Sequence, residues 1–126
     1  MPEQSRRTRG LDMYNEVYGG DLPAPPEGAM AFFDLMLEQV FAEVWSRETL
    51  SIRDRRLVTM GVIAALGERD TFAIQAKAAL KREELTPDQL REMLIHLASY
   101  AGYPRTAGLV GVVEQTIAAA EKEKAG

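Results

Sequence analysis

The sequence predicts an all-α protein, a compact bundle of about six helices that forms a single domain over residues 1–126. Apolar residues recur at steps of three and four along most of the chain, which is the spacing of an amphipathic helix. No strand-length run alternates apolar and polar residues between turn signals. A chain of 126 residues with 46% hydrophobic and 27% charged side chains has the size and composition of one globular domain.

The first 28 residues carry the weakest helical pattern. Residues 1–9 are expected to be a frayed, charged end, and residues 10–20 have a short helical spacing that Gly19 and Gly20 would stop. Residues 22–28 contain three prolines and can be neither helix nor central strand. We expect this proline-rich arm to lie extended over the domain.

A long amphipathic helix is predicted from residue 29 to about residue 45. Its apolar stripe consists of Phe32, Leu35, Met36, Val40 and Val44. The next helix opens with the capping-box form at residues 51–54 and runs to about Leu66, with Gly67 as its stop. Because this helix is nearly all apolar after Arg56, we expect it to be the buried, central one.

Three further helices follow. One covers residues 70–80. The next has the clearest start in the chain, with Thr86 as the cap, proline at the first helical position and Gln89 closing the box, and it ends at Gly102. The last runs from about residue 105 to residue 122. Alanine-rich faces on these helices favour close packing and self-association.

The composition excludes several classes of function. The formal net charge of -4 argues against nucleic acid as the main partner. The absence of cysteine excludes disulfides, thiolate zinc sites, iron–sulfur clusters and redox dithiols, and a single histidine excludes a histidine-rich metal site. The longest apolar run, residues 57–66, is too short to span a bilayer, and the N-terminus has no apolar signal-peptide core. We therefore expect a cytoplasmic protein with no metal and no membrane partner.

His96 and Gln75 are the first candidates for chemistry. Histidine is the side chain that most readily exchanges a proton near neutral pH, and His96 is the single histidine. The alternative is a partly buried histidine bonded to a backbone carbonyl. Gln75 shares a helical face with Phe72 and Ala79, so its amide is expected to point toward the core. There it either bonds to another helix or offers a donor and an acceptor to a ligand.

Three arginines, Arg53, Arg55 and Arg56, open the predicted apolar helix. Basic residues at a helix N-terminus oppose the helix dipole, which favours a reason other than helix stability. One such reason is a subsite for a single anion. Ordinary surface pairing with Asp54 or Glu48 is the alternative.

Several segments follow one another in an order that resembles the carboxymuconolactone decarboxylase family. They are residues 42–47, 51–68, 78–80 and 90–104. The Glu43-x-Trp45 and Tyr100-x-Gly102-x-Pro104 elements are similar to the decarboxylase branch of that family. Taken alone, Glu43 is as easily a surface carboxylate and Trp45 a packing residue. The resemblance covers roughly residues 9–117.

The resemblance implies an alkylhydroperoxidase-D-like helical fold, assembled as trimers or hexamers with active sites near the subunit contacts. It also implies a carbon–carbon lyase that works without metal or organic cofactor on a small carboxylated substrate. In the decarboxylase branch this reaction turns gamma-carboxymuconolactone into the enol-lactone of beta-ketoadipate, in the catabolism of aromatic compounds.

Such a reaction needs donors for a developing oxyanion, a cation for the spectator carboxylate and an acid that protonates carbon. Under the resemblance, the expected catalytic residues are His96, Glu68, Glu43 and Tyr100. The expected substrate-binding residues are Arg53, Arg56, Gln75 and Trp45.

The thiol-peroxidase branch, alkylhydroperoxidase D, differs from this chain at every position of its site. Its two cysteines would fall at Glu68 and Thr71, its histidine at Gln75 and its upstream glutamate at Arg56. The peroxidase activity is therefore excluded.

The chain also departs from the decarboxylase branch. That branch commonly has a histidine at the position of Gln75 and an Asn-Gly turn where this chain has residues 81–83. Glutamine cannot transfer protons at neutral pH. Either His96 supplies the proton instead, or the chain is a lyase or cyclase for a different substrate, or it is a non-catalytic helical oligomer that binds a small ligand.

Overall fold

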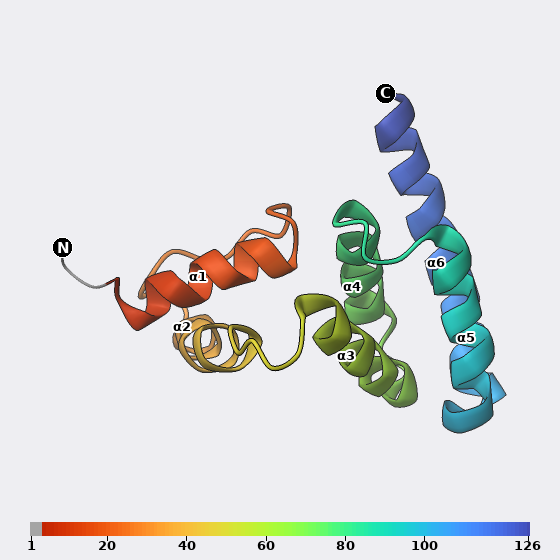
Figure 1. Ribbon diagram of the computed structural model, residues 1–126, viewed down its shortest axis with the longest axis horizontal. Coiled ribbons are helices and arrows are strands. Elements are labelled where there is room, and N and C mark those ends of the chain that lie inside the picture. Colours follow the sequence, from red (N-terminus) through yellow and green to blue (C-terminus); the bar gives the residue numbers. More distant parts are fainter. Residues whose placement is uncertain (1–3) are drawn as a thin grey trace. The chain divides into compact units, whose positions relative to one another are not determined.

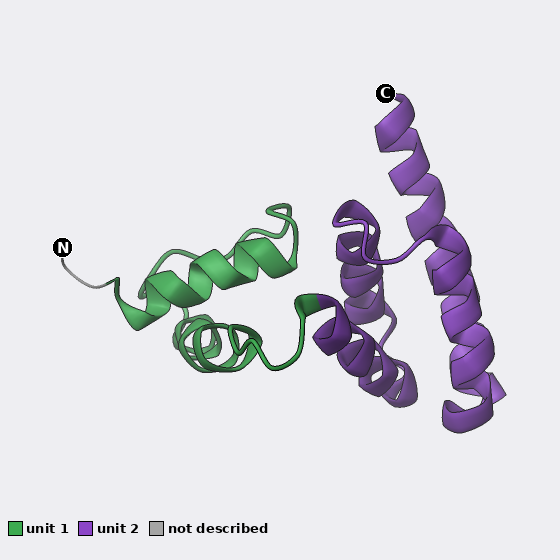
Figure 2. Cartoon of the chain, in the orientation of Figure 1, with its two compact units in different colours: residues 1–52 green, residues 53–126 purple. Residues whose placement is uncertain are grey.

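The computed structural model describes residues 4–126, and these form six α-helices, one π-helical segment and no strand (Figure 1). The prediction of an all-α bundle of about six helices is therefore confirmed. The chain forms two compact units, residues 1–52 and residues 53–126 (Figure 2).

The first unit contains α1 (Arg6–Val17), α2 (Ala31–Met36) and the π-helical segment η1 (Leu37–Trp45). The hydroxyl of Ser5 accepts a hydrogen bond from the backbone nitrogen of Thr8 over 3.1 Å and caps α1. The expectation of a frayed end is therefore wrong for residues 6–9, which form the first turn of α1. Residues 1–3 lie outside the described part of the chain.

An aromatic core holds α1 against η1. Gly10 of α1 comes so close to η1 that a Cβ at this position would lie 1.9 Å from the carbonyl oxygen of Leu37. The ring of Tyr14 meets Phe41 edge-on with 5.1 Å between centroids, and Phe41 stacks on Trp45 at 6.2 Å. The sequence thus places a glycine where two helices need a close approach.

The apolar stripe predicted for residues 29–45 is not the buried face. The buried residues of this helix are Leu37, Phe41 and Trp45. Four members of the predicted stripe are exposed, namely Phe32, Leu35, Val40 and Val44. For Val40 and Val44 the physical reason is the change from α-helix to π-helix at Leu37, because i to i+5 hydrogen bonds alter which residues share a face.

The proline-rich arm, residues 22–28, is tied to α1 through Arg7 and to α2 through Asp34. Arg7 donates from Nη2 to the carbonyl oxygen of Pro25 over 2.9 Å and from Nε to Oδ1 of Asp34 over 2.7 Å. The backbone nitrogen of Gly28 donates to the other carboxylate oxygen of Asp34 over 3.0 Å. The hydrogen bond from Arg7 holds the pKa of Asp34 below its ordinary value.

The second unit contains α3 (Ile52–Leu66), α4 (Arg69–Lys81), α5 (Pro87–Ala101) and α6 (Tyr103–Ala125), with bounds close to those predicted. Gly67 and Gly102, the predicted stops, have φ of 73° and 99°, which glycine adopts without steric cost. Thr86 and Gln89 form the predicted capping box at the start of α5.

One core joins the four helices of the second unit, and α6 packs against both α4 and α5 (Figure 1). Its buried residues are Met60, Ala64, Phe72, Ala76, Ala79, Leu80, Leu85, Leu90, Leu94, Leu109, Val113 and Ile117. No helix within residues 4–126 is both long enough and apolar enough to cross a membrane.

The prediction that α3 is the buried central helix is wrong. It packs through one face, at Arg56, Met60 and Ala64. The exposed residues on its other side are Val58, Val62 and Leu66, at 63%, 56% and 65%. Composition alone does not distinguish a helix buried inside its own chain from one whose second apolar face is free for another surface.

Candidate functional site

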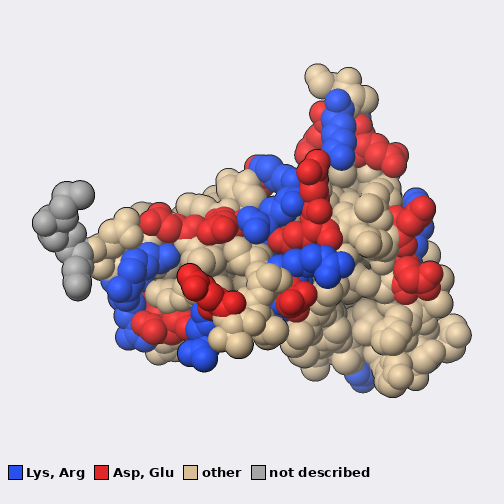
Figure 3. Space-filling view, in the orientation of Figure 1, with Lys and Arg blue, Asp and Glu red and all other residues tan. Residues whose placement is uncertain are grey.

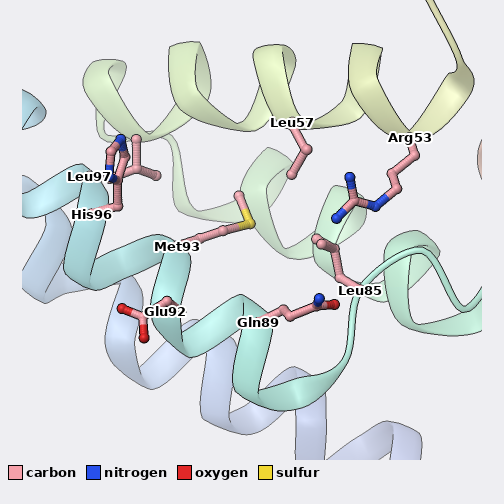
Figure 4. Close-up of a pocket in the computed structure, with 8 residues that line it drawn as sticks. All are labelled: Arg53, Leu57, Leu85, Gln89, Glu92, Met93, His96 and Leu97. Atoms are coloured by element: carbon pink, nitrogen blue, oxygen red, sulfur yellow. The ribbon is translucent and has the colours of Figure 1, made fainter.

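A pocket of about 400 Å³ lies between α3 and α5 in the second unit (Figure 4). Its lining residues are Arg53 and Leu57 of α3, Leu85 of the loop between α4 and α5, and Gln89, Glu92, Met93, His96 and Leu97 of α5. Helical periodicity explains this set, because residues three and four apart share a face. The pocket is therefore built by two helices and one loop residue.

The walls of the pocket are mainly apolar, and the guanidinium of Arg53 and the imidazole of His96 lie at opposite ends. Figure 4 shows Arg53 at one end and His96 at the other, with Leu57, Leu85 and Met93 between them. A small, mostly apolar cavity with a few separated polar groups is the usual form of a small-ligand site.

The guanidinium of Arg53 is fixed through its Nε atom, while its two terminal nitrogens remain available to the pocket. Its Nε donates to the carbonyl oxygen of Glu84 over 2.9 Å. Its Nη1 lies 3.9 Å from Oδ1 of Asp54, which is too far for a hydrogen bond. The terminal nitrogens point toward the pocket in Figure 4, where they can meet an anionic group.

Gln89 has a second role beside the helix cap. Its Oε1 accepts from the backbone nitrogen of Thr86 over 2.9 Å, which fixes the orientation of the amide. The Nε2 group of the same amide is left as a donor at the pocket. The sequence predicts the capping role of Gln89 but does not identify Gln89 as a residue that lines the pocket. The spacing of Gln89, Met93 and His96 on one helical face was the available signal.

His96 is exposed, and its ring lies beside Tyr100 with 5.2 Å between centroids. The alternative of a partly buried histidine is therefore wrong for this chain. Tyr100 itself is 81% exposed and does not belong to the pocket lining. The structure thus brings together Arg53 and His96 in one cavity, with Tyr100 next to the histidine.

Arg56 and Gln75 belong to a buried polar network and not to the pocket lining. Arg56 is 1% exposed and donates from Nη1 to Oε1 of Gln75 over 2.8 Å. Its Nε donates to Oε1 of Glu84 over 2.5 Å, and Glu84 also pairs with Arg82 at 2.6 Å. Gln75 thus bonds to a neighbouring helix, which is one of the two outcomes that its position on the core face predicts. Neither Arg56 nor Gln75 lines the cavity.

Residues 30–115 match the sequence pattern described as the Carboxymuconolactone decarboxylase family. The chain belongs to the carboxymuconolactone decarboxylase family. It is similar to the 4-carboxymuconolactone decarboxylase of Acinetobacter baylyi, with 29% identity over 120 residues that cover 91% of this chain and 89% of that protein. Membership and this similarity support a decarboxylase-like function. The matched residues run through both compact units, and a single family domain over residues 1–126 stays a prediction.

Glu43 and Trp45, the two residues of the Glu-x-Trp element, lie in the first unit. Glu43 is half exposed and pairs with Arg6 at 2.9 Å. Trp45 is buried and stacks on Phe41. Their predicted catalytic and binding roles stay predictions.

Glu68, the remaining expected acid of this family member, stands just before α4. It is exposed, and its carbonyl oxygen accepts from the backbone nitrogen of Phe72 over 3.1 Å. It does not line the pocket. Within residues 4–126, no group of three or more histidine, cysteine, aspartate or glutamate side chains is placed to hold a metal ion.

Proposed function

We propose that the pocket between α3 and α5 is the active site of a cytoplasmic, cofactor-free decarboxylase. Its substrate would be a small carboxylated lactone such as gamma-carboxymuconolactone, and its product the corresponding enol-lactone. The observation that carries this proposal is the separation of a cation, Arg53, from an imidazole, His96, across apolar walls. Family membership and the printed activity of the relative support it.

The proposed reaction breaks the bond between the ring carbon and the departing carboxylate, which leaves as carbon dioxide. The electron pair of that bond moves through the conjugated double bond onto the lactone carbonyl oxygen. A proton then adds to carbon and completes the product. The enzyme must therefore stabilise an oxyanion, hold the second carboxylate and deliver one proton.

Each requirement has a side chain at the pocket. Arg53 would hold the spectator carboxylate through its terminal nitrogens. The Nε2 group of Gln89 would donate to the developing oxyanion. His96 would supply the proton, with Tyr100 beside its ring. The apolar walls would strip water from the departing carboxylate.

The other predicted residues have different places in this proposal. Arg56 and Gln75 would act behind the site, through the loop that carries Glu84. Glu68 and Glu43 do not line the pocket, and we assign them no step.

The direct experiment is incubation of the purified chain with gamma-carboxymuconolactone while ultraviolet absorbance and carbon dioxide release are followed. We expect both signals to change together. Loss of activity in Arg53→Gln, with activity kept in Glu114→Gln, would support the assignment of the pocket. Equal turnover by wild type and Arg53→Gln would contradict it.

A second function is favoured by one observation. Gln75, where the decarboxylase branch commonly has a histidine, is 5% exposed and engaged with Arg56. A chain without that proton donor could instead be a non-catalytic oligomer that binds a small ligand, or a lyase or cyclase for another substrate. Absence of turnover together with intact assembly and ligand binding would favour these alternatives.

We also propose self-association as a trimer or hexamer. The exposed apolar residues Val58, Val62 and Leu66 repeat every four positions on α3, as one stripe of a helix. Figure 3 shows a wide area of mostly uncharged side chains over the second unit. Analytical ultracentrifugation is expected to give a defined oligomer for wild type and a smaller species for Val62→Lys.

A further inference from the structure

We propose that Glu84 is a positioning residue that fixes Arg53, the cation of the pocket. Glu84 lies in the loop between α4 and α5, and both its carboxylate and its carbonyl oxygen make contacts to arginines. This inference rests on the proposed function in one respect, the assignment of Arg53 to the substrate carboxylate.

The carboxylate of Glu84 anchors the loop. The side chain is 8% exposed, with Oε1 2.5 Å from Nε of Arg56 and Oε2 2.6 Å from Nε of Arg82. Arg56 in turn bonds to Gln75 on α4. A buried carboxylate is costly to place unless its partners compensate for lost water, and this one has two arginines. The network therefore ties the loop to α3 and to α4.

The backbone of the loop makes a tight turn just before Glu84. Glu83 has a φ of 56°, and it is the non-glycine residue with positive φ among residues 4–126. This left-handed conformation is unfavourable for a residue with a side chain. Backbone hydrogen bonds close this turn, from Glu83 to the carbonyl oxygen of Leu80 over 3.1 Å and from Glu84 to that of Ala79 over 2.9 Å. The ion pairs of Glu84 add side-chain links to α3 and to Arg82.

The carbonyl oxygen of Glu84 connects the loop to the pocket through Arg53. It accepts from Nε of Arg53 over 2.9 Å. The Arg53 side chain is 44% exposed and would otherwise sample many rotamers. Leu85, the next residue of the loop, is a wall of the same pocket. A shift of Glu84 therefore displaces both the cation and one apolar wall.

A measurement without ligand tests the coupling directly. In ¹⁵N NMR spectra, we expect the Nε–H of Arg53 to exchange slowly with water in the wild type and markedly faster in Glu84→Gln. Glu114→Gln is the matched control, because Glu114 is also bound by an arginine of this unit, Arg91, at 2.9 Å. It is expected to leave the Arg53 signal unchanged. Unchanged Arg53 exchange in Glu84→Gln would overturn the proposal.

A double-mutant cycle tests the consequence for binding. The probe is muconolactone, the same lactone without the departing carboxylate, and its Kd is measured by calorimetry. We expect Glu84→Gln to weaken binding about tenfold when Arg53 is present and to have little further effect in Arg53→Gln, since linked residues are not additive. An equal loss in both backgrounds would show a merely structural role and would contradict the proposal.

A second variant covers a folding failure, and one outcome separates this inference from the proposed function. If Glu84→Gln fails to fold, Arg82→Gln replaces it in both measurements, because it leaves the buried Arg56–Glu84 pair in place. A smaller change of the same kind is then expected in Arg82→Gln. If Arg82→Gln shows no change in either measurement, the inference is overturned. If wild type does not bind muconolactone but the Arg53 signal responds to Glu84→Gln, the proposed function fails and the positioning role stands.

Discussion

Arg56 donates a hydrogen bond from Nη1 to Oε1 of Gln75 over 2.8 Å, which links α3 directly to α4. By resemblance, Arg56 and Gln75 occupy the positions of a glutamate and a histidine in the thiol-peroxidase branch. Here they form a link between α3 and α4 whose donor and acceptor are both buried. The amide of Gln75 thus has a structural partner in Arg56.

Gln75→Ala is expected to destabilise the second unit by about 2 kcal/mol, because it removes the acceptor of a buried, charged donor. Urea unfolding followed by far-ultraviolet circular dichroism measures this change. Gln115→Ala on the exposed face of α6 is the control, with an expected change within about 0.5 kcal/mol. Equal stability of the two variants would show that the Arg56–Gln75 bond contributes little.

Gly10→Ala is expected to destabilise the first unit by about 3 kcal/mol or more, because the added Cβ would overlap the backbone of Leu37. Fluorescence of Trp45, the single tryptophan, reports this unit during unfolding. Gly111→Ala on α6 meets no atom within 4 Å and is expected to stabilise its helix by about 0.5–1 kcal/mol. A stable Gly10→Ala variant would contradict the close approach of α1 and η1.

Asp34 gives the first unit an acid-dependent stability. The hydrogen bond from Arg7 lowers the pKa of Asp34 in the folded state, so the contribution is complete above the unfolded value of about 3.9. The contribution is lost as the pH falls through the lower pKa that Asp34 has in the folded state. The free energy of unfolding at each pH is measured by urea titration followed by Trp45 fluorescence. We expect Asp34→Asn to remove most of its decrease below about pH 4. Asp12→Asn, which alters an exposed carboxylate, is expected to keep it.

Gly61 of α3 lies opposite Leu97, a wall of the pocket that Figure 4 shows beside His96. It follows Arg53 and Leu57 at four-residue steps on α3, and a Cβ there would meet one atom within 4 Å, Cδ2 of Leu97 at 3.9 Å. Gly61→Leu is therefore expected to fill this space and weaken muconolactone binding by about tenfold or more, with the fold retained. Gly111→Leu on α6 adds the same side chain outside the pocket and is the control. Unchanged binding in Gly61→Leu would place the ligand elsewhere.

Local signals predicted most of the second unit from the sequence. The Thr86–Gln89 capping box and the glycines at 67 and 102 act within a few residues, so their effect on helix ends can be read without a tertiary structure. The burial of α3 could not be predicted in the same way. Val58 and Val62 have the composition of core residues, yet lie on the surface of this chain.

The candidate site was predictable in part. His96 and Arg53 stand out by residue type, and the structure places both at one pocket. Glu84 gave no local signal, because its partner Arg56 is 28 residues away and a loop carboxylate is usually solvated. Its role depends on packing between α3 and the loop, which a one-dimensional pattern does not contain.

The most direct test of the proposed active site is the turnover of gamma-carboxymuconolactone by His96→Gln, followed by ultraviolet absorbance. Loss of a proton donor is expected to reduce kcat by about 10²–10⁴-fold. The thermal unfolding midpoint is expected to stay close to that of the wild type, because His96 is exposed. Muconolactone binding is expected to be largely kept, because Arg53 is the residue assigned to its carboxylate. Full activity in His96→Gln would contradict the assignment of the proton donor, and with it the central claim that this pocket carries out the decarboxylation.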